Sequence, residues 1–153
     1  MSPEEMKSRA RRIPEEVFTQ GDLAVADEVL ALGYIDRVPC PGQCGVAGVK
    51  GWALTLRRAF PDLSAIVEGE IAEGDTVVLR LTYRGTHAGA FLGIKPTGTR
   101  VSWQAMECLR LGPDGKVTDQ WMVADLLSVL QQIGALPHRF SFNSIPLPSP
   151  SQP

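Results

Sequence analysis

Hydrophobic residues in the first 20 positions recur at intervals of three or four, the spacing of one face of a helix. This apolar stripe consists of Met6, Ala10, Ile13 and Val17. Ser2 and Pro3 are typical of a helix start, and Gly21 is typical of a helix end. The pattern predicts an amphipathic helix to about Gln20, which Pro14 should kink because proline has no backbone N–H to donate.

Two further helices are expected before Pro61. Asp22 is placed to cap a short helix that Gly33 would end. The inward residues of this helix would be Leu23, Ala26 and Leu30. After a short extended piece and a Pro/Gly-rich loop, helical spacing returns over about residues 46–60, where Pro61 forbids continuation. The apolar stripe of this third helix is Val49, Trp52, Leu56 and Phe60.

From Ser64 onward the apolar period changes to two, the period of a β-strand. Residues 65–71 and 76–85 predict an antiparallel pair across a turn at residues 73–75, and residues 101–111 predict a long third strand. On the second of these strands one face is formed by Val77, Leu79, Leu81 and Tyr83. We expect one covered face and one wetter face in this sheet.

The segment 115–137 predicts a last strand followed by a last helix. Val117, Trp121 and Val123 share one strand face at period two. The helix stripe after them is Leu126, Leu130 and Ile133, and Gly134 with Pro137 supplies the stop.

Asp125 stands where this strand passes into this helix. By strand parity it shares the face of Trp121 and Val123, so we expect its carboxylate to point into an apolar interior, where it must be paired or used. An Asp directly before an apolar-periodic helix is equally typical of an N-cap. Both interpretations stay open, since a capping carboxylate can also have a functional role.

Three helices, about four strands and a final helix, in that order, favour an α+β fold. The helices would cover one face of a curved antiparallel sheet. At 153 residues the chain is the size of one domain, which we place at residues 1–137, with a Pro/Ser-rich tail at residues 138–153.

Composition excludes several classes of partner. A net charge of −2 gives no basic excess for nucleic acid or an anionic membrane surface. No apolar run approaches the ~18 residues of a membrane span, and the N-terminus lacks the apolar core of a signal peptide. We expect a cytoplasmic protein.

The three cysteines do not make a disulfide framework, because their number is odd. Cys40 and Cys44 lie close together in a Pro/Gly-rich loop and could bridge or hold a metal. Their spacing is not that of CxxC, a second ligand pair is missing, and both histidines lie far off in the sequence. A metal site is therefore not expected.

Three motifs carry a resemblance to a known family. They are AFPDL at residues 59–63, GTHAGAFLGIKPTG at residues 85–98 and GKVTDQWMVAD at residues 115–125. With them, about residues 5–137 resemble the SnoaL-like polyketide cyclases, also called ester cyclases, of the nuclear transport factor 2-like superfamily.

The resemblance implies a cone-shaped α+β fold with a pocket between sheet and helices, and a homodimer paired through the sheet. It also implies an activity, the cofactor-free intramolecular aldol closure of a ring in a polyketide ester. The substrate would be a hydrophobic small molecule. The catalytic aspartate of the family's WxxxD motif falls on Asp125. One carboxylate with a pKa near the operating pH can both take and return the proton, so no metal or cofactor is demanded.

Glu107 is a second catalytic candidate. It intrudes into an otherwise apolar strand face that is formed by Val101, Trp103, Ala105, Leu109 and Leu111. A lone acid on such a face is either a catalytic or substrate-orienting group, or a structural carboxylate tied to an arginine or a buried amide.

Five residues are candidates for substrate binding, each with a structural alternative. The aromatic and imidazole side chains concerned are Tyr34, Tyr83, His87, Trp103 and Trp121. The hydroxyl of Tyr34 could stand at the pocket mouth, although a tyrosine packed on a core edge is commoner. The place of His87 at a strand end favours a structural role, in which its side chain holds the loop through a hydrogen bond to the backbone. The tryptophans are typical of core or pocket wall.

Two departures from the family pattern leave other functions open. Arg37 and Gln120 stand where many members carry histidine, so two titratable groups are lost. A non-catalytic small-molecule binding protein of the same fold remains an alternative, as does a related isomerase or epoxide-type hydrolase.

Overall fold

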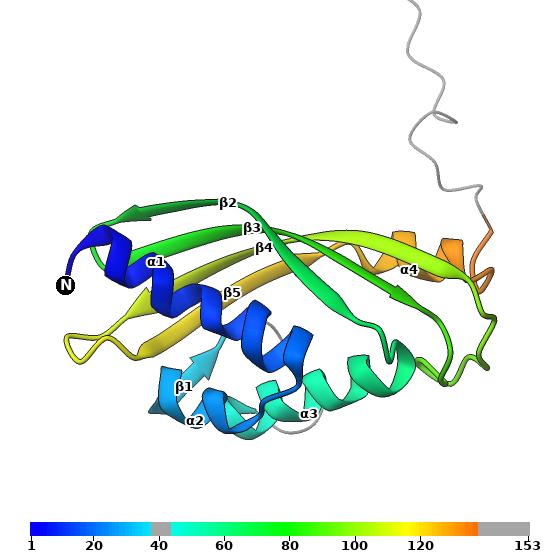
Figure 1. The fold of residues 1–153 in the computed structure, drawn as a ribbon, viewed down its shortest axis with the longest axis horizontal. Coiled ribbons are helices and arrows are strands. Elements are labelled where there is room, and N and C mark those ends of the chain that lie inside the picture. Colours follow the sequence, from blue (N-terminus) through cyan, green and yellow to red (C-terminus); the bar gives the residue numbers. More distant parts are fainter. Residues whose placement is uncertain (38–43, 138–153) are drawn as a thin grey trace, which may run out of the picture.

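A curved five-stranded sheet with helices on its concave side forms the body of the protein (Figure 1). The computed structural model describes residues 1–37 and 44–137. The sheet order is β1-β5-β4-β3-β2, in which β1 runs parallel to β5 and the other neighbours are antiparallel. The strands are β1 Leu30–Asp36, β2 Ser64–Glu73, β3 Thr76–Thr86, β4 Arg100–Leu111 and β5 Val117–Ala124. The predicted α+β fold is confirmed.

The N-terminal helix is continuous but changes its hydrogen bonding at the proline. α1 Pro3–Arg12 begins at a capping box formed by Ser2 and Glu5, and η1 Ile13–Gln20 follows as a π-helix. Pro14 cannot donate a backbone hydrogen bond, and its ring crowds the preceding turn, so the chain widens at this point instead of only bending. Gly21 ends the segment with φ 79, as expected of a left-handed helix terminus.

The second predicted helix is too long. α2 Ala24–Val29 stops at Val29, and Leu30 already begins β1, so Gly33 lies inside a strand and does not end a helix. Pairing with β5 explains the difference, because the edge of β5 offers backbone partners that local helix signals do not reveal. The third helix, α3 Gly45–Ala59, agrees with prediction to within a residue at each end.

The strands β3 and β4 have the predicted faces. Val77, Leu79 and Leu81 of β3 are fully buried, and they pair with Leu109, Glu107 and Ala105 of β4. These residues point toward the helices, so Glu107 lies on the concave inner face. The inner face of this pair is the main wall of the hydrophobic core.

The predicted face of β5 is wrong beyond its first residue. Leu111 pairs with Val117 but Arg110 pairs with Asp119, so Thr118 is an extra residue that forms a β-bulge. A bulge reverses parity, so Val117 faces the core while Trp121 and Val123 face outward, exposed to solvent. Asp125 follows the outward set, and the expectation that its carboxylate points into an apolar interior is wrong.

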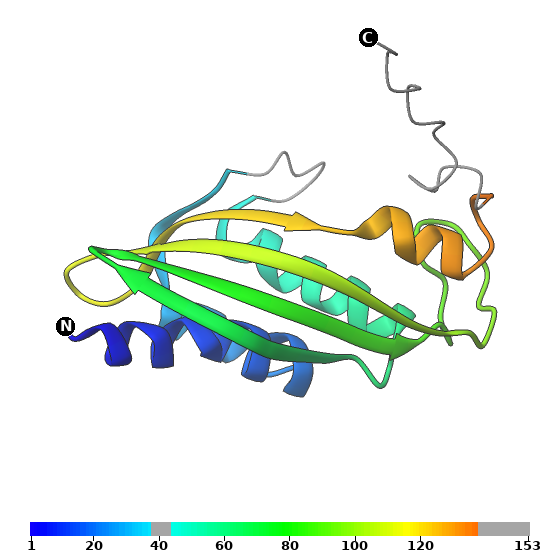
Figure 2. The same cartoon turned by 90° about the horizontal axis from the view of Figure 1, so that it is seen from above.

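The last helix, α4 Leu126–Gln132, lies beyond the end of the sheet and packs on β4 (Figure 2). The side-chain amide of Gln132 bonds both backbone groups of Ser102, which fixes α4 to the start of β4. None of the helices in the described ranges is long and apolar enough to cross a membrane. Cys40 and the tail at residues 138–153 lie outside the described residues.

Candidate functional site

A cluster of polar side chains lies on the inner face of the sheet, where apolar residues surround it. We call it the interior polar cluster, and its members are Tyr34, Asp36, Tyr83, Glu107 and Gln120. Strand pairing brings them together from four strands, since Asp36 of β1 pairs with Gln120 of β5, and β4 joins β5 to β3. Such a group on a core-facing surface requires either mutual hydrogen bonds or a ligand.

Glu107 is the carboxyl group of this cluster whose pKa is raised to about 7. Its side chain is 1% exposed, and its Oε1 accepts a long hydrogen bond of 3.3 Å from the hydroxyl of Tyr83. Its Oε2 is sealed from solvent and has no partner among the described residues. Burial raises the pKa of the Glu107 carboxyl from 4.5 to about 7; the hydrogen bond from Tyr83 opposes this rise, and the charge of Asp36 adds to it.

Tyr83 stays a hydrogen-bond donor in this site. Burial, followed by the proximity of Glu107, raises the pKa of the Tyr83 phenol well above its usual value. Its ring stacks on Trp103 with centroids 5.3 Å apart and planes 9° apart, which fixes the direction of the hydroxyl. The phenol is therefore held protonated and aimed at the carboxyl.

Gln120 and Tyr34 form the second hydrogen-bonded pair of the cluster. The hydroxyl of Tyr34 donates to Oε1 of Gln120 over 2.6 Å, and both side chains are buried. Tyr34 thus lies inside the protein, and the hypothesis that its hydroxyl stands at a pocket mouth is wrong.

The inner face of the sheet is partly exposed beside Glu107. Within residues 1–37 and 44–137, β1 pairs with β5 only as far as Gln120, so in this part of the chain no strand lies beside the last residues of β5. Met122, directly across from Glu107, and Ala124 point inward yet stay partly exposed, and Trp52 of α3 is partly exposed as well. Among the described residues, the flexible side chain of Met122 therefore lies between the buried carboxyl and the edge of β5.

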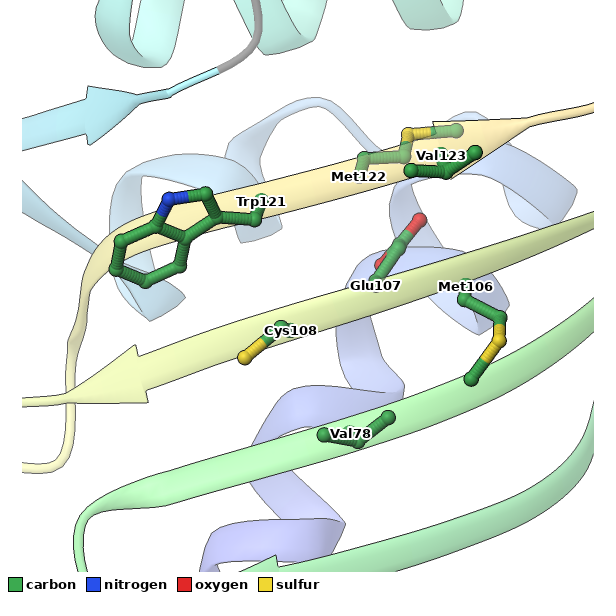
Figure 3. A pocket seen from close by; sticks show the side chains of 7 residues that line it. All are labelled: Val78, Met106, Glu107, Cys108, Trp121, Met122 and Val123. Atoms are coloured by element: carbon green, nitrogen blue, oxygen red, sulfur yellow. The ribbon is translucent and has the colours of Figure 1, made fainter.

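A separate hollow of about 300 Å³ lies on the opposite, convex face of the sheet (Figure 3). Its outward-pointing lining is Val78, Met106, Cys108, Trp121 and Val123. The guanidinium groups of Arg37 and Arg110 lie 5.9 and 5.4 Å from the ring centroid of Trp121. The bulge places Trp121 here, so it does not join the interior polar cluster.

Asp125 caps α4. Its Oδ1 accepts a hydrogen bond of 3.0 Å from the backbone N–H of Ser128, and its side chain is exposed. The cap interpretation of this residue is confirmed. The interior polar cluster is formed without it.

His87 lies at the far end of the aromatic core and serves the loop after β3. Its Nδ1 lies 3.0 Å from Oγ1 of Thr97 and accepts from the Thr97 backbone N–H over 3.3 Å. The ring of Phe60 stands between His87 and Trp103, with centroid distances of 5.8 and 5.4 Å. These contacts are those of the structural interpretation, a histidine that holds its loop.

Comparison with known families gives a match that covers most of the chain. The family model described as SnoaL-like polyketide cyclase matches residues 8–133. The chain belongs to this family.

One curated protein and two solved structures are similar to this chain over most of its length. Nogalonic acid methyl ester cyclase from Streptomyces nogalater is 28% identical over 123 residues, which are 76% of this chain and 89% of the relative. TsrD from Streptomyces laurentii is 26% identical, with a TM-score of 0.81 over 89% of this chain and 99% of its own. AclR from Streptomyces galilaeus, suggested to be a hydroxylase, is 32% identical, with a TM-score of 0.78 over 89% and 85% of the two chains.

Sequence reasoning missed two members of the site in this SnoaL-like chain. Gln120 was considered only as a position where many family members carry histidine. Without the bulge, alternation along β5 places Gln120 on the outer face. Asp36 was not considered as a candidate, because the short extended piece that contains it was not predicted to pair with the sheet. The signal that could have found both is the alternation of Tyr34 and Asp36, which is that of a strand edge beside Gln120.

Proposed function

We propose that this protein catalyses the cofactor-free intramolecular aldol closure of a ring in a polyketide-like ester, with Glu107 as general acid and base. The observation that carries the proposal is the buried Glu107 carboxyl, whose pKa is raised to about 7 and whose Oε2 has no partner among the described residues. At that pKa both protonation states are populated near neutral pH, as proton transfer in both directions requires.

The proposed reaction uses one proton twice. Oε2 of the ionised Glu107 takes a proton from an acidified carbon of the substrate, and the resulting enolate carbon attacks a carbonyl carbon of the same molecule. The new C–C bond leaves a negative charge on the attacked carbonyl oxygen, and Glu107 returns the proton to that oxygen. Tyr83 would hold Oε1 throughout, so that Oε2 stays free to face the substrate.

The proposal transfers the catalytic role from Asp125 to Glu107. The Asp125 side chain is exposed, and its Oδ1 caps α4 outside the interior polar cluster. The Glu107 carboxyl is buried inside that cluster, where burial raises its pKa to about 7.

A matched pair of variants tests this assignment. We name nogalonic acid methyl ester as the assay substrate, because the relative at 28% identity carries that name. Glu107→Gln keeps size and hydrogen-bonding shape but cannot transfer a proton, and we expect kcat to fall by about 10²-fold or more. Asp125→Asn keeps the helix cap and should retain kcat within a few-fold. Full turnover by Glu107→Gln, or loss of turnover in Asp125→Asn alone, would overturn the assignment.

Hydroxylation is a second candidate function, favoured by the 32% identity to AclR. Hydroxylation by molecular oxygen consumes O₂ and incorporates one of its oxygen atoms, whereas ring closure consumes none. An oxygen electrode in the same assay separates the two. If O₂ is consumed in proportion to the product formed, the protein is a hydroxylase and the cyclase proposal is wrong. Saturable binding of the ester without turnover would instead support the third candidate, a non-catalytic small-molecule binding protein.

We also propose that two copies pair through the convex face of the sheet. The support is the run of exposed apolar side chains around the hollow of Figure 3, including Met106, Trp121 and Val123. This pairing would cover the face opposite to the site and leave the inner edge beside Glu107 open.

A further inference from the structure

Gln120 occupies a position on the inner face from which it can act together with Glu107. It pairs with Leu109 of β4, while Glu107 pairs with Met122, so Gln120 and Glu107 are diagonal neighbours on the same face. Diagonal neighbours in an antiparallel pair stand about 7–8 Å apart at their backbones. Side chains of this length can span that separation and meet at a single substrate group.

The contact with Tyr34 decides which atoms of the amide remain available. Oε1 accepts from the Tyr34 hydroxyl at 2.6 Å, so the acceptor end of the amide is occupied. Nε2 carries two N–H donors and makes no hydrogen bond within residues 1–37 and 44–137. Unlike Oε2 of Glu107, Nε2 is not among the atoms sealed from solvent. The amide donors are therefore unpaired within the described residues and are not fully closed off from solvent.

We propose that the side-chain amide of Gln120 donates a hydrogen bond to the substrate oxygen on which negative charge develops, and that Tyr34 is the positioning residue that orients this amide. The inference rests on the proposed function. An amide suits this task because it donates without titrating, so its donor stays present at every pH at which Glu107 changes state. A fixed donor aimed at a developing oxyanion lowers the barrier without having to reorganise during the reaction.

The division of tasks follows from the chemistry of the two groups. Glu107 can give and take a proton, but once ionised it would repel an enolate or alkoxide. Gln120 cannot move a proton, but its N–H groups attract such an oxygen. A charged intermediate between them is held by the amide while the carboxyl carries the proton.

Oxyanion binding in a Glu107→Gln background tests the inference without turnover, because the neutral background removes repulsion by the carboxylate. The probe is 4-nitrophenol at a pH where it is ionised, followed by its visible absorbance, and nitrobenzene is the uncharged control of similar shape. Adding Gln120→Leu should weaken 4-nitrophenolate binding by about tenfold or more, because a hydrogen bond to a charged group is lost. Nitrobenzene binding should stay unchanged.

Tyr34→Phe provides the positioning test in the same background. It should weaken 4-nitrophenolate binding while leaving nitrobenzene binding intact. The Tyr34→Phe and Gln120→Leu changes combined should be no worse than Gln120→Leu alone, since both remove one interaction.

Three results would overturn the inference. They are equal binding of 4-nitrophenolate with and without Gln120→Leu, an equal loss for nitrobenzene, and no binding of 4-nitrophenolate by the Glu107→Gln protein. These outcomes are distinct from failure of the proposed function, which is decided by turnover of the Glu107→Gln and Asp125→Asn proteins.

Discussion

The environment of Glu107 favours its uncharged form, and this has a consequence for stability as well as for catalysis. Burial raises the pKa of this carboxyl to about 7 in the folded protein, whereas the unfolded chain has the ordinary value near 4.5. Between these two pH values the folded protein holds a proton that the unfolded chain has lost. The stability associated with this group is therefore complete below pH 4.5 and is lost as the pH rises through about 7.

Glu107→Gln should remove this pH dependence, because an amide imitates the protonated acid at every pH. From pH 5 to pH 8 we expect the wild type to lose more unfolding free energy than the variant, by on the order of 3 kcal/mol for a pKa shift of this size. Urea unfolding of both proteins at the two pH values measures the difference. Carboxylates with a lowered pKa, such as Asp119 and Glu16, also make stability depend on pH. Their contribution is the same in the wild type and the variant, so it cancels in the difference between the two proteins. Parallel pH dependences would contradict the prediction.

Asp36→Asn should lower the pKa of Glu107. The negative charge of Asp36 adds to the rise caused by burial, so its removal makes the ionised form of Glu107 easier to reach. The pKa can be followed by ¹³C NMR of the Glu107 carboxyl or from the pH profile of kcat, and both should move to lower pH. Asp114→Asn, in the β4–β5 turn far along the sheet, serves as the charge-matched control and should leave the pKa in place. An unchanged Glu107 pKa in Asp36→Asn would count against this coupling.

At the scale of elements, the bulge in β5 decides which residues form the site. Alternation along β3 and β4 predicted their faces correctly, because a strand without a bulge keeps its parity from end to end. Thr118 breaks that rule in β5, and nothing in the local sequence marks it, since a bulge is a property of the pairing with β4. The lone acid at position 107 was therefore found from sequence, whereas its partners Gln120 and Asp36 required the pairing of β5 with β4 and β1.

The cap on α4 gives a prediction that separates its structural role from catalysis. Asp125→Ala removes the acceptor for the Ser128 N–H and should cost about 1 kcal/mol of unfolding free energy. Asp125→Asn should cost less, because its side-chain oxygen can still accept. Chemical denaturation measures both. Equal stability of the Ala variant and the wild type would show that Gln132 and the packing of α4 on β4 hold this helix without the cap.

At the scale of the whole molecule, the two faces of the sheet differ in chemistry, and we propose a different task for each. The concave face carries the interior polar cluster, and the inward-pointing residues at the end of β5 beside it are partly exposed. The convex face carries apolar side chains in direct cross-strand contact, with Met106 opposite Val123 and Cys108 opposite Trp121. Met106 is 54% exposed and Val123 77% exposed, which is costly for a surface that stays in water. Because the faces are separate, the proposed association and the proposed catalysis can be perturbed independently.

Val123→Glu should therefore yield a monomer that keeps the site. A carboxylate at this position would have to be buried without a partner at the centre of a pairing through the convex face, and that desolvation opposes association. Sedimentation equilibrium of the wild type and the variant measures the change in dimer dissociation constant, which we expect to rise by about tenfold or more. Leu54→Glu is the matched control, because Leu54 is also exposed but belongs to α3 on the other side of the sheet. A wild type that remains monomeric at every concentration, or a Val123→Glu protein that dimerises as the wild type does, would show that the convex face serves another purpose.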